Sequence, residues 1–290
     1  MVGRKLQLLG RSAAVLLALA PLSGCGKPVK ALGHGASTEP RVTVLLSEGG
    51  PGAGDAAVTT AATTAVAGYG TFKGRVVVSG AFSPLAPLLA EGAPTKDAIC
   101  SQKAIPDESV VVGPNNGLAN VFIYLKKVPG GEIPPAPSEP GVVDQQGCRF
   151  LPHAAVFRVG QPLVFKNGDP VAHNTAFTPQ SSSVFNQTVT ANDREGVPYK
   201  YEKPEAVPVR AKCDFHSWMG SYHLPLTHPW GAVTAEDGSF EIKGVPGTAV
   251  EFVIWHEKAQ YINRALKVTI PVDGVLEQEV TVDAAKLAAK

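Results

Sequence analysis

The stretch that decides the predicted fold of this chain is Cys213-Asp214-Phe215-His216-Ser217-Trp218-Met219. It places a thiolate, an imidazole and a thioether on one short loop with C-x-x-H-x-x-M spacing. A second imidazole, His173, lies upstream, just after a strand-like run at residues 156–166. Two imidazoles, one thiolate and a weak thioether are the ligand set of a trigonal copper site for electron transfer. The predicted metal ligands are therefore His173, Cys213, His216 and Met219.

Each of these side chains also has an ordinary structural role. An isolated Cys is most often a small buried hydrophobe, and an isolated Met usually fills core space. The combination, in this order and spacing, favours copper. Zinc also binds Cys and His, but zinc sites rarely recruit Met. A binuclear copper centre is disfavoured because no second Cys follows Cys213.

The loop resembles that of the cupredoxins, the small blue-copper proteins, and its spacing matches the short ligand loop of the amicyanins. The pair His173-Asn174, which follows the strand-like residues 163–167, is similar to the first-ligand segment of plastocyanin and amicyanin. The resemblance covers about residues 142–226. It implies a cupredoxin-like Greek-key β-sandwich, which we expect to occupy residues 142–228.

The resemblance also implies a role for each ligand. His173, Cys213 and His216 would be the equatorial copper ligands, and Met219 would be the axial one. Asn174 would tie the two ligand loops together. The resemblance thus implies one copper ion per chain, cycling between Cu(I) and Cu(II).

The same resemblance places the electron port at the ligand loop. The ring edge of His216 would reach the surface, and Trp218 with Phe215 and Leu224 would form a small apolar docking patch. Phe215 departs from the family pattern, because these loops often carry Pro at that position.

A second pattern follows the ligand loop. Residues 234–247 read T-x-x-D-G-x-F-x-I-x-x-V-P-G, which predicts a hairpin with Asp237-Gly238 at its tip. The pattern resembles the second half of a carboxypeptidase-regulatory or transthyretin-like sandwich. Gly74-Arg75-Val76 and residues 119–123 are similar to strands in the first half of that family.

These patterns together predict an all-β protein. With 30 Gly and 25 Pro and no long helical period, the chain is typical of strands and turns. We expect a cupredoxin-like sandwich inserted in or packed on a second, transthyretin-like sandwich; a single enlarged cupredoxin is the alternative. The two halves of the second sandwich would be residues 69–130 and 229–290.

The first residues read as a secretory leader. Residues 1–24 contain three basic and no acidic side chains, and their apolar run at 13–22 is too short to span a bilayer. The run ends in Leu22-Ser23-Gly24-Cys25, which resembles the lipobox of bacterial lipoproteins, where the Cys is acylated. Ordinary cleavage near residues 18–20 is the alternative.

Residues 25–68 are rich in Ala, Gly, Thr, Ser and Pro, which predicts a flexible tether. The leader, the lipidated Cys25 and the tether together predict an exported lipoprotein, periplasmic or anchored to the outer membrane. Its membrane contact would be the N-terminal lipid.

The four cysteines can each be given a separate role. With Cys25 lipidated and Cys213 on copper, Cys100 and Cys148 remain as one pair. Disulfides persist in exported proteins, so we expect this pair to be bridged. The bridge would close a loop of about 48 residues and contribute on the order of 4 kcal/mol in the chain-entropy model.

Composition excludes some partners. The net charge is +1, and removal of a leader with three positive side chains brings it to −2. Because the chain is near neutral and has no basic run, nucleic acid is not an expected partner. No catalytic motif stands out, and four ligands leave no open metal position, so an enzyme is not expected.

The leading hypothesis is a type 1 (mononuclear blue) copper protein that acts as a membrane-tethered periplasmic electron carrier between redox proteins. The alternative is a non-enzymatic lipoprotein that stores or senses copper, or that binds or adheres through its second sandwich.

Overall fold

The computed structural model describes residues 66–288, which form sixteen β-strands and three short 3-10 turns. The predicted leader, Cys25 and the predicted tether up to residue 65 lie outside the described residues. No helix in the described part is long and apolar enough to cross a membrane. The strands are β1 Tyr69–Ser79, β2 Phe122–Leu125, β3 Gly141–Gln145, β4 Phe150–Leu151, β5 Ala154–Arg158, β6 Leu163–Asn167, β7 His173–Phe177, β8 Phe185–Val189, β9 Val197–Tyr199, β10 Val209–Lys212, β11 Gly220–Leu226, β12 Gly231–Val233, β13 Ser239–Pro246, β14 Ala249–His256, β15 Gln260–Thr269 and β16 Val275–Asp283; the turns are η1 Ala98–Ser101, η2 Pro114–Asn116 and η3 Ala284–Lys286.

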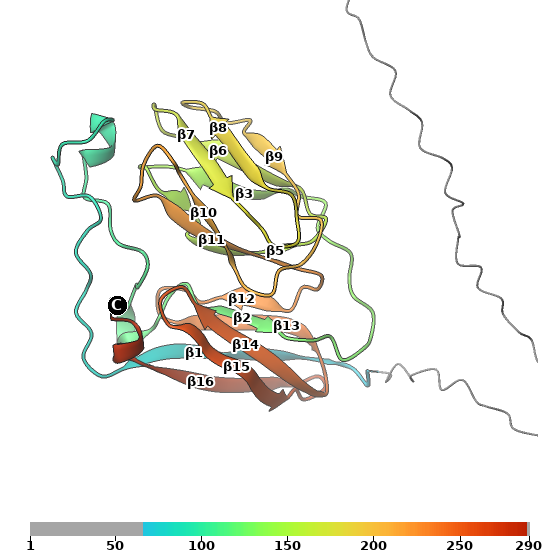
Figure 1. The fold of residues 1–290 in the computed structure, drawn as a ribbon. Helices are drawn as coiled ribbons and strands as arrows, with labels where there is room; N and C mark the ends of the chain where they lie inside the picture. The colour runs from blue at the N-terminus through green and yellow to red at the C-terminus, as the bar shows by residue number, and fades with distance from the viewer. Residues whose placement is uncertain (1–65, 289–290) are drawn as a thin grey trace, which may run out of the picture. The chain divides into compact units, whose positions relative to one another are not determined.

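The strands form four sheets, visible as layers in Figure 1. Two sheets, ordered β13-β1-β16 and β12-β2-β14-β15, combine strands from both ends of the described chain. The other two, ordered β5-β11-β10-β7-β8 and β4-β3-β6-β9, use only strands between them in sequence. We call β3–β11 the inserted block and the remaining strands the flanking block. The all-β prediction, with one sandwich inserted in another, is confirmed.

The flanking block is held together by an alternating strand. Buried and partly exposed residues alternate along β1, which puts Phe72 and Val76 on its buried face. The ring centroid of Phe72 lies 4.7 Å from that of Phe252 on β14, in the facing sheet. Glycine is required at position 74 because β1 approaches the paired strand β16 closely there. A Cβ atom at Gly74 would lie 1.8 Å from the carbonyl oxygen of Gln278.

The strands β2 and β14 at the centre of their sheet are buried on both faces. Ile123 and Leu125 point into the flanking core, while Phe122 and Tyr124 join a cluster with Leu224 on β11 of the inserted block. All four residues of β2 are therefore buried. Side chains of β14 alternate between the same two clusters. A strand buried on both faces reads as a continuous apolar run, which is how β2 appears in the sequence.

Aromatic side chains fill the core of the inserted block. The ring centroid of Phe165 on β6 lies 5.6 Å from that of Phe177 on β7 and 5.1 Å from that of Phe185 on β8. These rings come from both sheets, so they hold the two sheets of the block together. The strand that begins with His173 is thereby fixed by its own aromatic end, Phe177.

A loop at residues 88–105 leaves the flanking block and packs against the inserted one. A backbone hydrogen bond of 2.8 Å from the Leu88 N–H to the Ile105 carbonyl closes its two ends. Cys100, in η1, forms a disulfide with Cys148 of the inserted block. The disulfide predicted from the sequence is thus confirmed.

The predicted hairpin around Asp237-Gly238 is wrong. Two backbone hydrogen bonds of 2.9 Å close the turn, from the Gly238 N–H to the Ala235 carbonyl and from the Ala235 N–H to the Ser239 carbonyl, and the strands then diverge. Strand β12 pairs with β2 and β13 pairs with β1, in different sheets. The turn therefore joins the two layers of the flanking sandwich. Phe240 and Ile242, after the turn, are buried in the flanking core from the sheet of β1 and not from the sheet of β12.

The burial of β2 on both faces leads to a testable prediction. Replacing Phe122 with Ala should lower the free energy of unfolding by about 3–5 kcal/mol, because a fully buried aromatic ring between the two blocks is lost. Chemical denaturation measures this change. Val275→Ala, at an exposed position, is the matched control. A cost below about 1 kcal/mol for Phe122→Ala would contradict the packing of the two blocks.

Candidate metal centre

Three neighbouring strands bring the predicted ligands together. His173 begins β7, Cys213 follows the last residue of β10, and His216 and Met219 lie in the turn that leads into β11. Strand β10 lies between β7 and β11 in the sheet, so these residues meet at one end of it. Backbone hydrogen bonds tighten the turn, from the Cys213 N–H to the Met219 carbonyl at 3.2 Å and from the Met219 N–H to the His216 carbonyl at 3.0 Å.

A polar side chain shapes the turn before His173. The Asn167 amide donates to the carbonyls of Val171 at 2.8 Å and Thr190 at 2.9 Å, and its oxygen accepts from the Asp169 N–H at 2.9 Å. These contacts satisfy backbone groups that no strand pairs. The turn therefore presents His173 in a fixed position.

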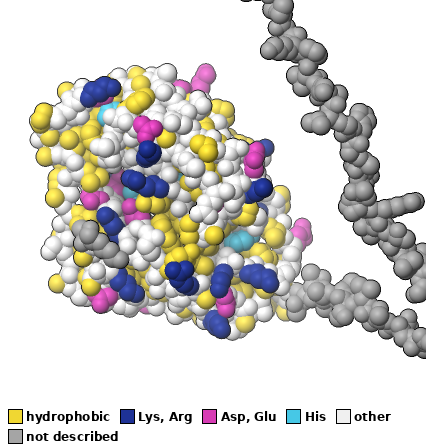
Figure 2. Space-filling view, viewed as in Figure 1, with side chains coloured by type: hydrophobic (Ala, Val, Ile, Leu, Met, Phe, Trp, Pro, Cys, Tyr) yellow, Lys and Arg dark blue, Asp and Glu magenta, His cyan; other side chains and the backbone are white. Residues whose placement is uncertain are grey.

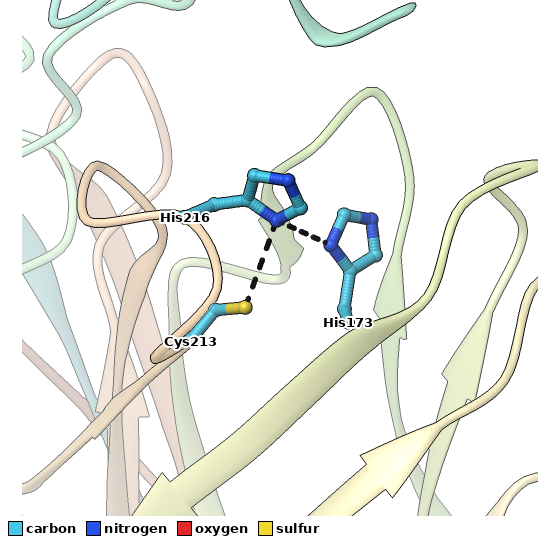
Figure 3. Close-up of side chains that lie close together, drawn as sticks. All are labelled: His173, Cys213 and His216. Carbon is cyan, nitrogen blue, oxygen red and sulfur yellow. Dashed lines mark hydrogen bonds between the residues drawn. The ribbon is translucent and has the colours of Figure 1, made fainter. Parts of the chain in front are cut away.

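The donor atoms of three predicted ligands converge, as Figure 3 shows. The Nδ1 atoms of His173 and His216 are 2.9 Å apart, and the Cys213 Sγ lies 3.8 Å from the His216 Nδ1. All three side chains are buried, and Met219 in the same turn is buried as well. The structure thus brings the two imidazoles and the sulfur of Cys213 to a single point.

Each imidazole is oriented by a carboxylate on its far side. The Nε2 of His173 lies 2.9 Å from the Asp169 Oδ2, and the Nε2 of His216 lies 2.8 Å from the Asp97 Oδ2. A carboxylate only accepts, so each Nε2 carries the hydrogen. In the neutral rings both Nδ1 atoms are then lone-pair acceptors that face each other. Such an arrangement is satisfied by a cation between them.

The sulfur of Cys213 is prepared to be a thiolate. Burial by itself would raise the pKa of Cys213, but hydrogen bonds from His173 and from backbone N–H groups outweigh it and hold the pKa below its ordinary value. One of these is the Asn174 N–H, 3.4 Å from Sγ. The thiolate is the form that binds metals.

The two imidazoles differ in their electrostatics. Burial would lower the pKa of His173, but its hydrogen bonds with Asp169 and Cys213 raise it above the ordinary value. The pKa of His216 is lowered, because burial is the larger effect and the charge of His173 adds to it, while Asp97 opposes both. In the metal-free protein, a proton between the two Nδ1 atoms is therefore held more readily by His173 than by His216.

The donor set fits copper. Two imidazole nitrogens and a thiolate suit either copper or zinc, and the thioether of Met219 in the same turn favours copper. His173, Cys213 and His216 would hold the ion, with Met219 as the fourth donor.

Asn174 connects the two ligand segments. Its side-chain oxygen accepts from the Asp214 N–H, and its amide donates to the Asp214 Oδ2 at 3.1 Å. Its own backbone N–H reaches the sulfur of Cys213. The residue thus links the start of β7 to the loop that carries Cys213.

The expected exposure of His216 is wrong. The residue is 1% exposed, because the 88–105 loop lies over its ring edge. Cys100 of that loop has its Sγ 3.8 Å from the His216 Nε2. Phe215 is 43% exposed, with the ammonium of Lys96 5.7 Å from its ring centroid, and Trp218 is partly buried beside His216. The expected place of Leu224 in the docking patch is wrong, because its side chain is fully buried in the cluster between the two blocks.

Neither Asp97 nor Asp169 is among the site residues predicted from the sequence. Asp169 lies four residues before His173, and it also accepts backbone N–H groups of Gly147 at 2.7 Å and Cys148 at 2.8 Å. Asp97 comes from a segment that the sequence analysis placed within a sandwich half. The available signal was the predicted disulfide at Cys100, three residues after Asp97, which links that segment to the inserted block.

A second group of polar side chains lies where the blocks meet. His153 pairs through Nε2 with Glu257, and its Nδ1 lies 4.0 Å from the Glu108 Oε2. Burial lowers the pKa of His223 and of His256 to about 3, with a smaller effect from the charge of His153. These are interface and core histidines, and their donor atoms do not converge on one point in the described chain.

Comparisons with known proteins find similar chains among solved structures. No protein-family model and no curated protein matches the chain. Among solved structures, it is similar to a purple cupredoxin from Nitrosopumilus maritimus, with 17% identity over 30% of this chain and 99% of that one and a TM-score of 0.25. It is also similar to amicyanin from Paracoccus versutus, with 18% identity over 36% of this chain and 97% of that one and a TM-score of 0.27.

A third similarity is to a copper-containing nitrite reductase from Thermus scotoductus SA-01. The identity is 19%, over 35% of this chain and 25% of that one, and the TM-score is 0.27.

The disulfide gives a test by thiol counting. Protein that begins after Cys25, folded under oxidising conditions and then denatured without reductant, should show one reactive thiol, that of Cys213, because Cys100 and Cys148 are bonded. Reduction should raise the count to three. Three reactive thiols before reduction would mean that the bridge does not form.

Proposed function

We propose that this protein is a type 1 (mononuclear blue) copper protein that carries single electrons. The observation that carries the proposal is the convergence of two Nδ1 atoms and the Cys213 sulfur, with both ring N–H groups already given to carboxylates. Copper bound there would supply one-electron redox chemistry and an intense thiolate-to-copper absorption.

The protein's own residues favour electron transfer over catalysis. The ligand side chains are buried and fixed by hydrogen bonds, so they need little movement when the charge of the site changes. Met219 would take the fourth position, which leaves none for a substrate. Such a closed site supports a carrier rather than an enzyme.

Partners and location belong to the same proposal. Redox partners would meet the protein through a small, transient contact, as such encounters usually do. Phe215 and Trp218 remain partly exposed on the ligand loop and would form part of that contact. On the face in Figure 2, acidic and basic side chains are interspersed, which does not favour nucleic acid. The lipid on Cys25 would hold the protein to the membrane in the periplasm.

The colour of copper-loaded protein tests the proposal. Wild-type protein should show the intense visible band, and Cys213→Ser should lose it while keeping its fold, because only the thiolate supplies this transition. Ser217→Ala, an exposed change on the same loop, should keep the band. Copper binding without the band in the wild type would end the type 1 proposal.

Voltammetry separates a carrier from a store. We expect a reversible one-electron wave, and Met219→Leu should shift it to higher potential because loss of the thioether weakens donation to Cu(II) more than to Cu(I). A coloured protein without a reversible wave would instead favour the alternative of copper storage or sensing.

A further inference from the structure

We propose that Asp97 is a positioning residue for the metal ligand His216, and that the disulfide-anchored 88–105 loop holds it over the imidazole as a cap. This inference rests on the proposed copper function. It assigns a role to a loop that no minimal copper-binding sandwich needs. It also means that electrons do not leave through the ring edge of His216.

The contact between the two side chains is direct. The Asp97 Oδ2 accepts from the Nε2–H of His216 at 2.8 Å, so the Nδ1 of His216 is left to face the metal position. Without this acceptor, the buried ring would be free to carry its hydrogen on Nδ1 instead, which blocks the metal. Asp97 thus selects the tautomer that binds.

The carboxylate of Asp97 has no other partner in residues 66–288. Its only hydrogen bond and its only ion pair are with His216. Asp169, its counterpart on His173, differs in this respect because it also accepts two backbone N–H groups and so supports the fold of its turn. The carboxylate of Asp97 therefore serves the imidazole alone.

The loop is anchored firmly enough to keep Asp97 in place. The Cys100 N–H donates to the Asp97 backbone carbonyl at 2.9 Å, and Cys100 is bonded covalently to Cys148. Leu89 and Ile99 of the same loop pack against the core of the inserted block. A positioning group is most effective when its own support is rigid, and here that support is covalent.

The cap has two consequences for the copper site. A carboxylate on the far nitrogen makes the imidazole a stronger donor, which stabilises Cu(II) relative to Cu(I). The cap also excludes water from the ring edge, since His216 is buried beneath the loop. Both effects should disappear together when Asp97 is shortened.

The first test uses metal-free protein and NMR of the imidazole N–H groups. In the wild type, the Nε2–H of His216 should give a signal that exchanges slowly with water, because it is buried and hydrogen-bonded. Asp97→Ala should lose this signal, and Asp97→Asn, which can still accept, should keep it with faster exchange. Glu91→Gln, an exposed change on the same loop, should leave it unaltered.

The second test uses copper-loaded protein. Asp97→Ala should weaken Cu(II) binding about 10–100-fold in a chelator competition, the usual cost of losing such a partner. Cu(I) binding should change less, so the reduction potential should rise, by about 59 mV for each tenfold difference between the two affinities. Asp97→Asn should lie between Asp97→Ala and the wild type.

The outcomes separate this inference from the proposed function. If the wild type binds no copper in a coloured form, the proposed function fails, while the NMR signal still decides the position of Asp97. If the wild type is a normal carrier and Asp97→Ala changes neither the His216 signal nor the potential, the role of Asp97 is overturned. An unchanged denaturation midpoint in Asp97→Asn excludes general unfolding as the cause of any effect.

Discussion

The candidate metal centre depends on one interaction made twice, the donation of an imidazole Nε2–H to a carboxylate. Asp169 receives it from His173 and Asp97 receives it from His216, so that both Nδ1 atoms face inward at 2.9 Å. Lone pairs that face each other in a buried place are unfavourable unless a cation separates them. The donors are therefore arranged before any ion binds, at a cost to the stability of the metal-free protein.

The surrounding fold explains why this arrangement holds. Strands β7, β10 and β11 fix the ligand segments, and the aromatic core behind β7 leaves the strand little room to move. On its other side the inserted block packs against β2 and β14, two strands that are themselves buried on both faces. The flanking block thus supports the ligand-bearing sheet from below, while the 88–105 loop covers one imidazole from outside. The site is enclosed by three parts of the chain that are distant in sequence.

Several features could be predicted from the sequence because they are local or combinatorial. The ligand loop was recognisable from residues within one turn, where spacing alone brings Cys213, His216 and Met219 near each other. The bond between Cys100 and Cys148 followed from counting cysteines in a chain that we expect to be exported. The all-β class followed from turn residues and alternating strands. The hairpin at Asp237-Gly238 failed because a turn signal does not reveal whether the flanking strands pair with each other or with strands in other sheets.

By itself, the sequence determined the composition of the donor set and the chemistry that this set can perform. Only the tertiary structure decided which groups stand behind the donors and whether they meet water. Asp97 is far from His216 in the chain, and its neighbour Cys100 indicates only that this segment reaches the inserted block. The contact with the imidazole itself depends on how the disulfide-linked loop lies over the site. Burial and hydrogen bonding depend on such long-range packing, whereas ligand identity depends on the side chain alone, and for this reason His216 could be predicted as a ligand but not as a covered one.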